Sequence, residues 1–260
     1  MARESRPTVD LNADLGESFG VWRLGHDEEM LSLVTSANVA CGFHAGDPVH
    51  MRETVRSAVR RGVKVGAHPG YPDLAGFGRR AMALTHEEIV AALLYQVGAL
   101  QAIAAAEGGQ VLYVKPHGAL YNQAEVDQAV AGAVAEGVRL AGQGRSLPLV
   151  GPSGSALERA AAAAGLTFVP EVFADRAYDA RGRLVPRSRP GAVIREPEEV
   201  TSRVLDMVLR GEVATVEGTR LSVRAATICF HGDTPEAPTL VRTVREALEA
   251  AGVEVAAFVR

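Results

Sequence analysis

The sequence contains very little cysteine. Only Cys41 and Cys229 occur among its 260 residues, each inside an apolar, strand-like run. A chain of this length is stabilised by its hydrophobic core rather than by disulfides, so two buried free thiols are expected. A nucleophilic role for either thiol is the less favoured interpretation, because catalytic thiols usually occupy exposed, electropositive surroundings.

The sequence also lacks strong net charge and clustered basic residues. The formal net charge is −4 and the basic residues are scattered, so no nucleic-acid partner is expected and a small molecule is the expected ligand. The first eight residues are polar and charged, and no apolar run is expected to be long enough to span a bilayer. These features predict a cytoplasmic protein without a membrane partner.

The remaining composition is typical of a globular protein, with 47% hydrophobic and 22% charged residues. Strand-like and helical stretches alternate, which predicts an α/β fold with a parallel sheet, built as a single domain over residues 1–260. Seven or eight strands would close a distorted, TIM-like β/α barrel. The expected strands are Val9–Asp14, Ser36–Cys41, Val63–His68, Val111–Lys115, Pro148–Gly151, Leu166–Val172, Ala225–His231 and Val253–Phe258.

Two of the expected helices carry clear boundary signals. Asp47 before Pro48 is typical of a helix start, and Gly62 is placed to end that helix. Thr85 and Glu88 have the spacing of a capping box, which predicts a long helix through residue 106.

Polar side chains collect at the ends of the expected strands. In the first strand Asp10, Asn12 and Asp14 share one face, because strand side chains alternate. Burying such a face costs several kcal/mol unless partners or a ligand compensate. Similar residues lie at the carboxyl ends of the other expected strands or just beyond them, namely Asn38, His44, His68, Lys115, His117, Glu171, Asp175, His231 and Asp233.

Barrel enzymes place their active sites at the carboxyl ends of the strands. Any single residue of this set is explained equally well by a structural role, but the convergence of six strands predicts a site. Two long irregular connections, residues 69–82 and 174–194, are rich in glycine, proline and arginine. Their arginines suit an anionic substrate, although solvated loops remain an alternative for most of them.

A divalent metal is left open by the sequence. His44, His68, His117 and His231 with Asp10 and Asp14 have suitable chemistry, but HEXXH and CXXC motifs are absent. A phosphate-binding P-loop is absent too, so any ATP would be held unconventionally or by another polypeptide.

Seven sequence strings together resemble the LamB/YcsF family and cover nearly the whole chain. They are DLNADLGESFG (10–20), SANVACGFHAGDP (36–48), GAHPGYPDLAGFGRR (66–80), VKPHGALYN (114–122), EVFADRAY (171–178), LVPRSRPGAVI (184–194) and CFHGD (229–233). The resemblance implies a barrel of the glycoside hydrolase/deacetylase type. It also implies ATP-dependent opening of 5-oxoproline to glutamate, together with partner subunits B and C.

These considerations yield two groups of candidate residues. The expected catalytic residues are Asp10, Asn12, Asp14, Glu17, His44, His68, Lys115, His117, Glu171, His231 and Asp233. The expected substrate- or phosphate-binding residues are Asn38, Arg79, Tyr121, Arg176 and Arg187.

Roles within these groups are hypotheses. Asp14, Glu17 or His117 is a candidate base for water, and Lys115 with Arg176 is expected to balance developing negative charge. His231, paired with Asp233, is a candidate acid for the departing nitrogen.

Two other functions remain open. A metal-dependent deacetylase acting on a carbohydrate would use the same fold and histidines. A non-catalytic subunit that binds substrate for its partners would use the same pocket.

Overall fold

Seven parallel strands form the centre of the molecule. A computed structural model describes residues 6–231 and 236–260. The strands are β1 (Thr8–Leu15), β2 (Ser36–Ala40), β3 (Lys64–His68), β4 (Val111–Val114), β5 (Leu149–Pro152), β6 (Phe168–Phe173) and β9 (Thr227–His231). They pair in this order, and β9 pairs back to β1, so the sheet closes into a barrel. The predicted TIM-like barrel is therefore confirmed, with seven strands.

The eighth expected strand, Val253–Phe258, is shorter than predicted and does not join the closed ring. Only Glu254–Val255 forms a strand, β10, and it pairs with Thr8 and Val9 of β1, below the closed ring. A short two-stranded sheet of β7 (Glu212–Ala214) and β8 (Arg220–Ser222) was not expected from the sequence and lies outside the barrel.

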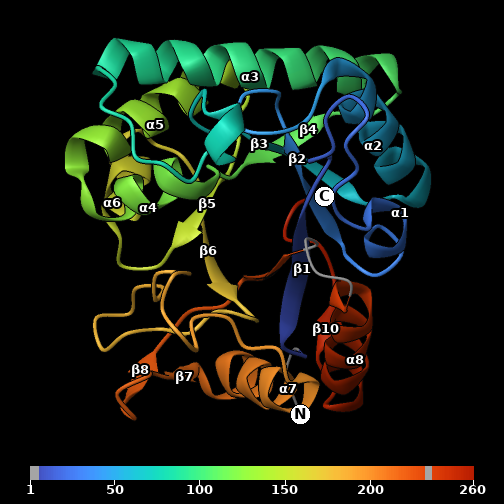
Figure 1. The fold of residues 1–260 in the computed structure, drawn as a ribbon, viewed down its shortest axis with the longest axis vertical. Coiled ribbons are helices and arrows are strands. Elements are labelled where there is room, and N and C mark those ends of the chain that lie inside the picture. Colours follow the sequence, from blue (N-terminus) through green and yellow to red (C-terminus); the bar gives the residue numbers. More distant parts are fainter. Residues whose placement is uncertain (1–5, 232–235) are drawn as a thin grey trace, which may run out of the picture.

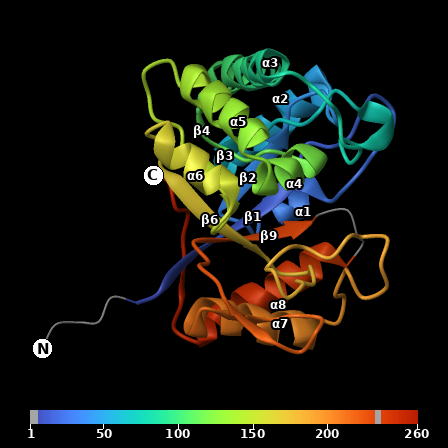
Figure 2. The same ribbon diagram turned by 90° about the vertical axis from the view of Figure 1, so that its left-hand side faces the viewer.

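Helices surround the ring, as Figure 1 shows. They are α1 (Asp27–Met30), α2 (Pro48–Arg61), α3 (His86–Ala106), α4 (Gly118–Val126), α5 (Gln128–Ala141), α6 (Ala156–Ala163), α7 (Pro197–Leu205) and α8 (Ala237–Ala250), with a 3-10 turn η1 (Leu74–Gly76) and a π turn η2 (Asp206–Arg210). The irregular segment 174–194 lies between α4 and α7 and is seen in orange in Figure 2.

The predicted helix boundaries are confirmed by their caps. The Asp47 carboxylate accepts hydrogen bonds from the backbone of the first turn of α2, and Gly62 ends that helix at φ 71°. Such a left-handed conformation is accessible to glycine at little cost. Thr85 and Glu88 form the reciprocal capping box of α3.

Helix α3 corrects the expectation that no apolar run is long enough to span a bilayer. Its 21 residues meet that requirement by length and composition. One face of the helix, including Leu93, Val97 and Leu100, is buried in the main hydrophobic core. Packing of this face over the barrel accounts for much of the apolar character of α3.

Side-chain alternation in β1 divides the barrel wall into two environments. Leu11, Ala13 and Leu15 belong to the hydrophobic core between the strands and the helices. Asp10, Asn12 and Asp14 alternate with them and are also buried, where they contact polar residues of other strands. The barrel therefore has a polar interior, and this interior is continuous with the site at the carboxyl ends of the strands.

Candidate active site

A cavity of about 470 Å³ opens beside the carboxyl ends of the strands. Its lining combines strand ends with the arginine-bearing connections, as expected for this fold. The predicted residues that line it are Asp14, Glu17, His68, Arg79, Lys115, His117, Tyr121, Arg176, Arg187 and His231.

Lys115 is the central charge of the site. Its ammonium nitrogen lies 2.9 Å from Glu171 Oε1 and 3.1 Å from Asp14 Oδ1, and the side chain is buried. Burial alone would lower the pKa of Lys115, but Asp14 and Glu171 hold it well above its usual value. Lys115 therefore supplies a fixed positive charge at the cavity wall.

Asp14 is kept ionised by its neighbours. Burial alone would raise the pKa of Asp14, but His68 and Lys115 hold it well below its usual value. Asn38 also donates a hydrogen bond of 2.8 Å to Asp14 Oδ1, which favours the charged form. The carboxylate can therefore act as a charged acceptor or stabiliser rather than as an acid.

An amide network lies below these charges. Asn38 Nδ2 donates to Asn12 Oδ1 at 2.6 Å, and Tyr113 donates its hydroxyl to Asn38 Oδ1 at 2.8 Å. Asn12 Nδ2 in turn donates to Glu171 Oε1 at 3.0 Å. Asn12, Asn38 and Glu171 are outside the set of residues that line the cavity, so they position Asp14 and Lys115 from behind.

Asp10 lies one layer deeper in the barrel and accepts hydrogen bonds from three hydroxyl groups. Thr35 and Ser36 each donate to its Oδ1 at 2.6 Å, and Thr227 donates to its Oδ2. Burial raises the pKa of Asp10 to about 6, against these hydrogen bonds, which lower it. Asp10 does not line the cavity, and its contacts are those of a buried structural carboxyl group.

Two histidines are anchored by backbone carbonyl groups. His68 Nδ1 lies 2.7 Å from the carbonyl oxygen of Lys115, and His117 Nε2 lies 2.8 Å from that of Phe77. The other nitrogens, His68 Nε2 and His117 Nδ1, face each other at 3.0 Å. Burial, with the neighbouring His68, lowers the pKa of His117 to about 3, so its ring is neutral.

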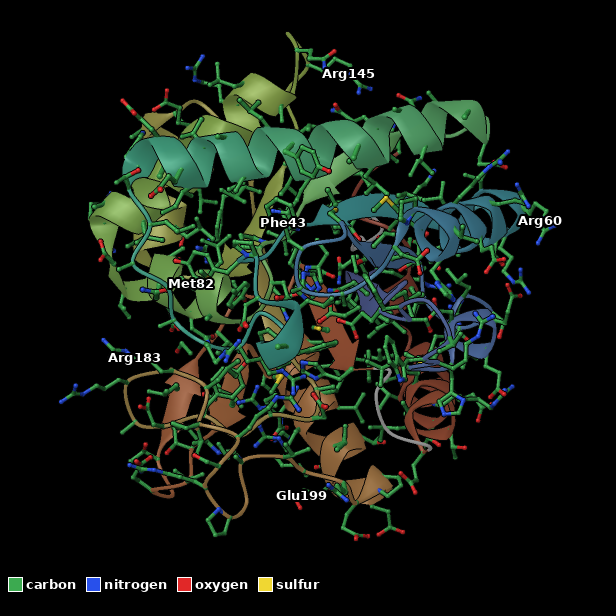
Figure 3. The ribbon with its side chains drawn as sticks, turned by 45° about the horizontal axis from the view of Figure 1, so that its top comes forward. Phe43, Arg60, Met82, Arg145, Arg183 and Glu199 are labelled. Atoms are coloured by element: carbon green, nitrogen blue, oxygen red, sulfur yellow. The ribbon has the colours of Figure 1, made fainter. Side chains whose placement is uncertain are left out.

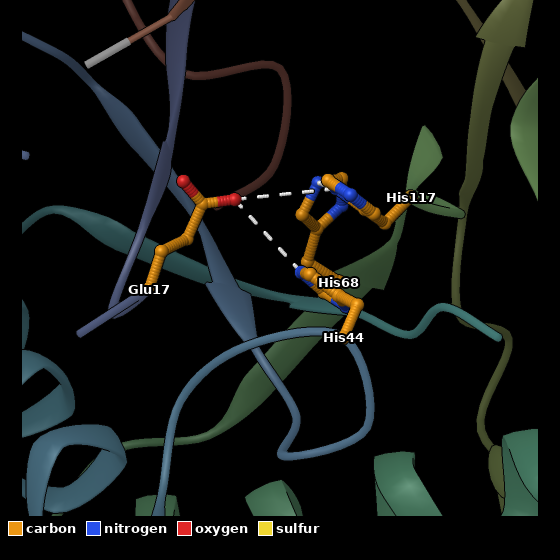
Figure 4. A group of neighbouring side chains, drawn as sticks. All are labelled: Glu17, His44, His68 and His117. Atoms are coloured by element: carbon orange, nitrogen blue, oxygen red, sulfur yellow. Dashed lines mark hydrogen bonds and ion pairs between the residues drawn. The ribbon is translucent and has the colours of Figure 1, made fainter. Parts of the chain in front are cut away.

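His44 and Glu17 complete this group, as Figure 4 shows. The His44 ring stacks on His117 with a centroid distance of 3.7 Å, and its Nε2 lies 3.8 Å from Glu17 Oε1. Neither ring nitrogen of His44 has a hydrogen-bond partner among the residues that the structure describes, although the side chain is fully buried. Burial holds the pKa of His44 well below its usual value.

His231, which lies beside Asp14 on the neighbouring strand β9, is paired with a carboxylate. Its Nδ1 lies 2.9 Å from Asp175 Oδ2, and its ring stacks on Phe173. An imidazole fixed in this way presents its second nitrogen for proton transfer. The expected partner, Asp233, lies outside the described residues. The sequence indicated Asp175 only as one of the polar residues near the strand ends, and not as the partner of His231.

The arginines of the two irregular connections have different roles. Arg176 is buried and donates from Nη2 to the carbonyl oxygen of Val185 at 2.7 Å and from Nε to that of Ala192. It therefore holds the 174–194 segment together as well as lining the cavity. Arg187 and the exposed Arg79 line the opening, and Arg183 projects at its periphery (Figure 3).

Tyr121 and Glu125 form a wall of the cavity on α4. The Tyr121 hydroxyl donates to Glu171 Oε2 at 3.0 Å, so it orients that carboxylate. Glu125 was missed by the sequence reasoning, although its spacing of four residues from Tyr121 places both on one helix face. Burial raises the pKa of Glu125 to about 7.

Comparisons with known proteins agree on one family. A family model described as the LamB/YcsF family matches residues 9–260. The A-subunit of 5-oxoprolinase from Methylococcus capsulatus is 56% identical over 96% of both chains. A lactam utilization protein from Thermus thermophilus is 53% identical, with a TM-score of 0.91 over 96% of this chain and 100% of that chain.

The fold alone extends to more distant proteins. A deacetylase solved with its substrate has a TM-score of 0.51 and 12% identity over 96% of this chain and 88% of that chain. This likeness supports the expected deacetylase type of barrel, and it carries no information about the substrate of this chain.

Proposed function

The chain belongs to the LamB/YcsF family, and on this premise we propose that it is the A-subunit of an ATP-dependent 5-oxoprolinase, binding and opening the lactam. Relatives that carry this 5-oxoprolinase name match it at 55–56% identity along almost their whole length. The name of these relatives supports partner subunits, and we propose that these are subunits B and C.

The observation that carries the proposal is the buried Lys115 beside a cavity with arginines at its opening. 5-Oxoproline is a small ring with one carboxylate and one amide carbonyl. Arg187 and Arg79 are suited to the carboxylate, because guanidinium groups bind carboxylates in a bidentate manner. Lys115 is suited to stabilise negative charge that develops on the carbonyl oxygen.

Ring opening requires activation of a resonance-stabilised amide. Transfer of the terminal phosphoryl group of ATP to the lactam oxygen would make the ring carbon electrophilic. Water then forms a bond to this carbon, and the carbon–nitrogen bond breaks to leave an acyl phosphate at the opened end. A second water molecule cleaves the acyl phosphate, which releases phosphate and leaves the carboxylate of glutamate. The nitrogen takes a proton, for which His231, held by Asp175, is the candidate donor.

We assign ATP binding to the assembled enzyme rather than to this chain by itself. The sequence has no P-loop, so the partner subunits are the proposed source of the activated phosphoryl group. A cytoplasmic location is part of the same proposal, because ATP and 5-oxoproline are available there.

The test is reconstitution with omission of each component. The chain is mixed with its candidate partners, 5-oxoproline and ATP, and the release of glutamate and phosphate is measured. We expect both products only when all components are present. The proposal is wrong if the partners release glutamate at the same rate without this chain.

Asp14→Asn distinguishes a catalytic role from one limited to substrate binding. The change keeps the size of the side chain and removes the charge beside Lys115. We expect turnover to fall by about 100-fold or more, as for other charged groups that stabilise a transition state. Unchanged turnover would support the non-catalytic alternative.

A deacetylase is a second candidate function, because three histidines and Glu17 lie together as possible metal ligands. Release of acetate from acetylated amino sugars by the isolated chain would support it. We expect no such release.

A further inference from the structure

Four side chains from four separate segments converge beside the cavity. Glu17 follows β1, His44 follows β2, His68 ends β3 and His117 follows β4. One ligand atom of each lies within 4.8 Å of all the others. We propose that these four residues bind one divalent transition-metal ion, with Zn²⁺ as the best match to three imidazoles and one carboxylate.

The first argument is the orientation of His68 and His117. Each ring directs one nitrogen at a backbone carbonyl oxygen, at 2.7 Å and 2.8 Å. These contacts place a proton on the anchored nitrogen and leave the lone pair of the other nitrogen directed at the shared point. Carbonyl-anchored imidazoles of this kind are characteristic of metal ligands.

The second argument is His44. Its ring is fully buried, and neither nitrogen has a hydrogen-bond partner within the described part of the chain. Burial of an unsatisfied polar group is unfavourable, so such a group requires an explanation. A metal ion bound to Nε2 would give that nitrogen its partner.

The third argument is the spacing of the ligand atoms. In a tetrahedral site with bonds of about 2.1 Å, neighbouring ligand atoms are about 3.4 Å apart. The separations are 3.0 Å between His68 Nε2 and His117 Nδ1, 3.8 Å between His44 Nε2 and Glu17 Oε1, and 4.0 Å between His117 Nδ1 and Glu17 Oε1. These separations lie on both sides of the ideal value. Because the His44 and His117 rings stack in parallel, binding also requires the His44 ring to rotate until its Nε2 lone pair faces the ion.

The charges nearby also favour a cation at this point. Asp14 Oδ2 lies 3.3 Å from His68 Nε2 and adds a second carboxylate beside the group. A neighbouring group of Asp14, Cys229 and His231 has ligand chemistry too. Lys115 lies 2.9 Å from Cys229 Sγ and 3.1 Å from Asp14 Oδ1, so its positive charge already fills that position.

The ion would border the cavity, because Glu17, His68 and His117 line it. A metal ion in this position could polarise a substrate oxygen or a bound water molecule. This inference goes beyond the proposed reaction and does not depend on it, because the four side chains converge whatever the substrate is.

The experiment measures metal binding to the isolated chain, without 5-oxoproline, ATP or partners. The chain is stripped with chelator and titrated with Zn²⁺ in competition with a chromophoric chelator. We expect one tight site per chain. His44→Ala should weaken binding by more than about 100-fold. Loss of a residue that only supports a ligand already costs about 10- to 100-fold in metal affinity, and His44 is proposed as a direct ligand. His86→Ala is the matched control, because His86 is an exposed histidine paired with Glu136.

A second measurement uses the unaltered chain, so it does not depend on the folding of any variant. Co²⁺ added to the stripped protein should produce the intense visible absorption of a four- or five-coordinate site, and Zn²⁺ should abolish it. The inference is overturned if Co²⁺ shows only the weak spectrum of the aqueous ion, or if wild type and His44→Ala bind Zn²⁺ equally.

Discussion

Lys115 Nζ lies 2.9 Å from Glu171 Oε1, and both side chains are buried. The chain has only two lysines, Lys64 and Lys115, and one of them forms this internal ion pair. Burial of a charge is tolerated only with such compensation, so the stability of the barrel and the charge of the site depend on the same contact.

Removal of one partner should therefore destabilise the fold. We expect Lys115→Met to lower the free energy of unfolding by about 3–5 kcal/mol, because Asp14 and Glu171 would remain as unpaired buried carboxylates. Urea denaturation measures this change. Lys64→Met is the matched control, since Lys64 is partly exposed at the start of β3. Addition of Glu171→Gln to Lys115→Met should recover part of the loss, and a further loss would contradict the assignment.

Asp10 should make stability depend on pH. Its folded pKa of about 6 exceeds the ordinary value of 3.8, so folding favours the protonated carboxyl group. This contribution is fully present below pH 3.8 and is lost as the pH rises through about 6. Relative to Asp10→Asn, the wild type should lose about 3 kcal/mol of unfolding free energy across this window. Urea denaturation of the metal-free proteins at several pH values measures the difference, and parallel curves would refute it.

The Asp175–His231 pair should affect turnover rather than substrate binding. Asp175→Asn removes the charge that orients the His231 ring, so we expect kcat to fall by about 100-fold with little change in KM. The pH profile of kcat should also change shape. Asp206→Asn serves as the control, because Asp206 forms surface ion pairs with Arg210 and Arg220. Equal kcat values for the two variants would exclude His231 as the acid.

Gly78 should be intolerant of a side chain because of its position between two histidines. A Cβ atom there would lie 2.7 Å from His44 Cβ and 2.8 Å from His117 Cδ2. Gly108→Ala is a matched control, because both glycines have positive φ and Gly108 has open space. The backbone cost of about 1–2 kcal/mol is common to both. Gly78→Ala should lose about 1–3 kcal/mol more in denaturation. Equal losses would show that the histidines move aside freely.

Much of the fold could be predicted from local features. The capping residues Asp47 and Thr85 define helix starts through hydrogen bonds to their own first turns, so their neighbours in sequence are sufficient evidence. The length of the eighth strand was overestimated, because the strand-like residues at 253–258 pair only where β1 leaves an edge uncovered. That condition depends on tertiary structure and has no local signal.

The candidate site was predicted as a set of residues but not as an arrangement. Alternation along β1 correctly placed Asp10, Asn12 and Asp14 on one face, yet only Asp14 reaches the cavity, because the others lie deeper in the barrel. Thr35, Ser36 and Thr227, which surround Asp10, were missed, since isolated hydroxyl residues are common and carry no pattern.

The sequence by itself determined the alternation of strands and helices, the phase of the polar residues and the family, because these depend on neighbours along the chain. Only the tertiary structure decided that Asp175 is the described partner of His231, and that three histidines face one point with Glu17. Closure of the ring between β1 and β9 brings together residues more than 200 positions apart, such as Asn12 and Thr227. Distances between such residues depend on barrel geometry, and no local pattern of residues specifies them.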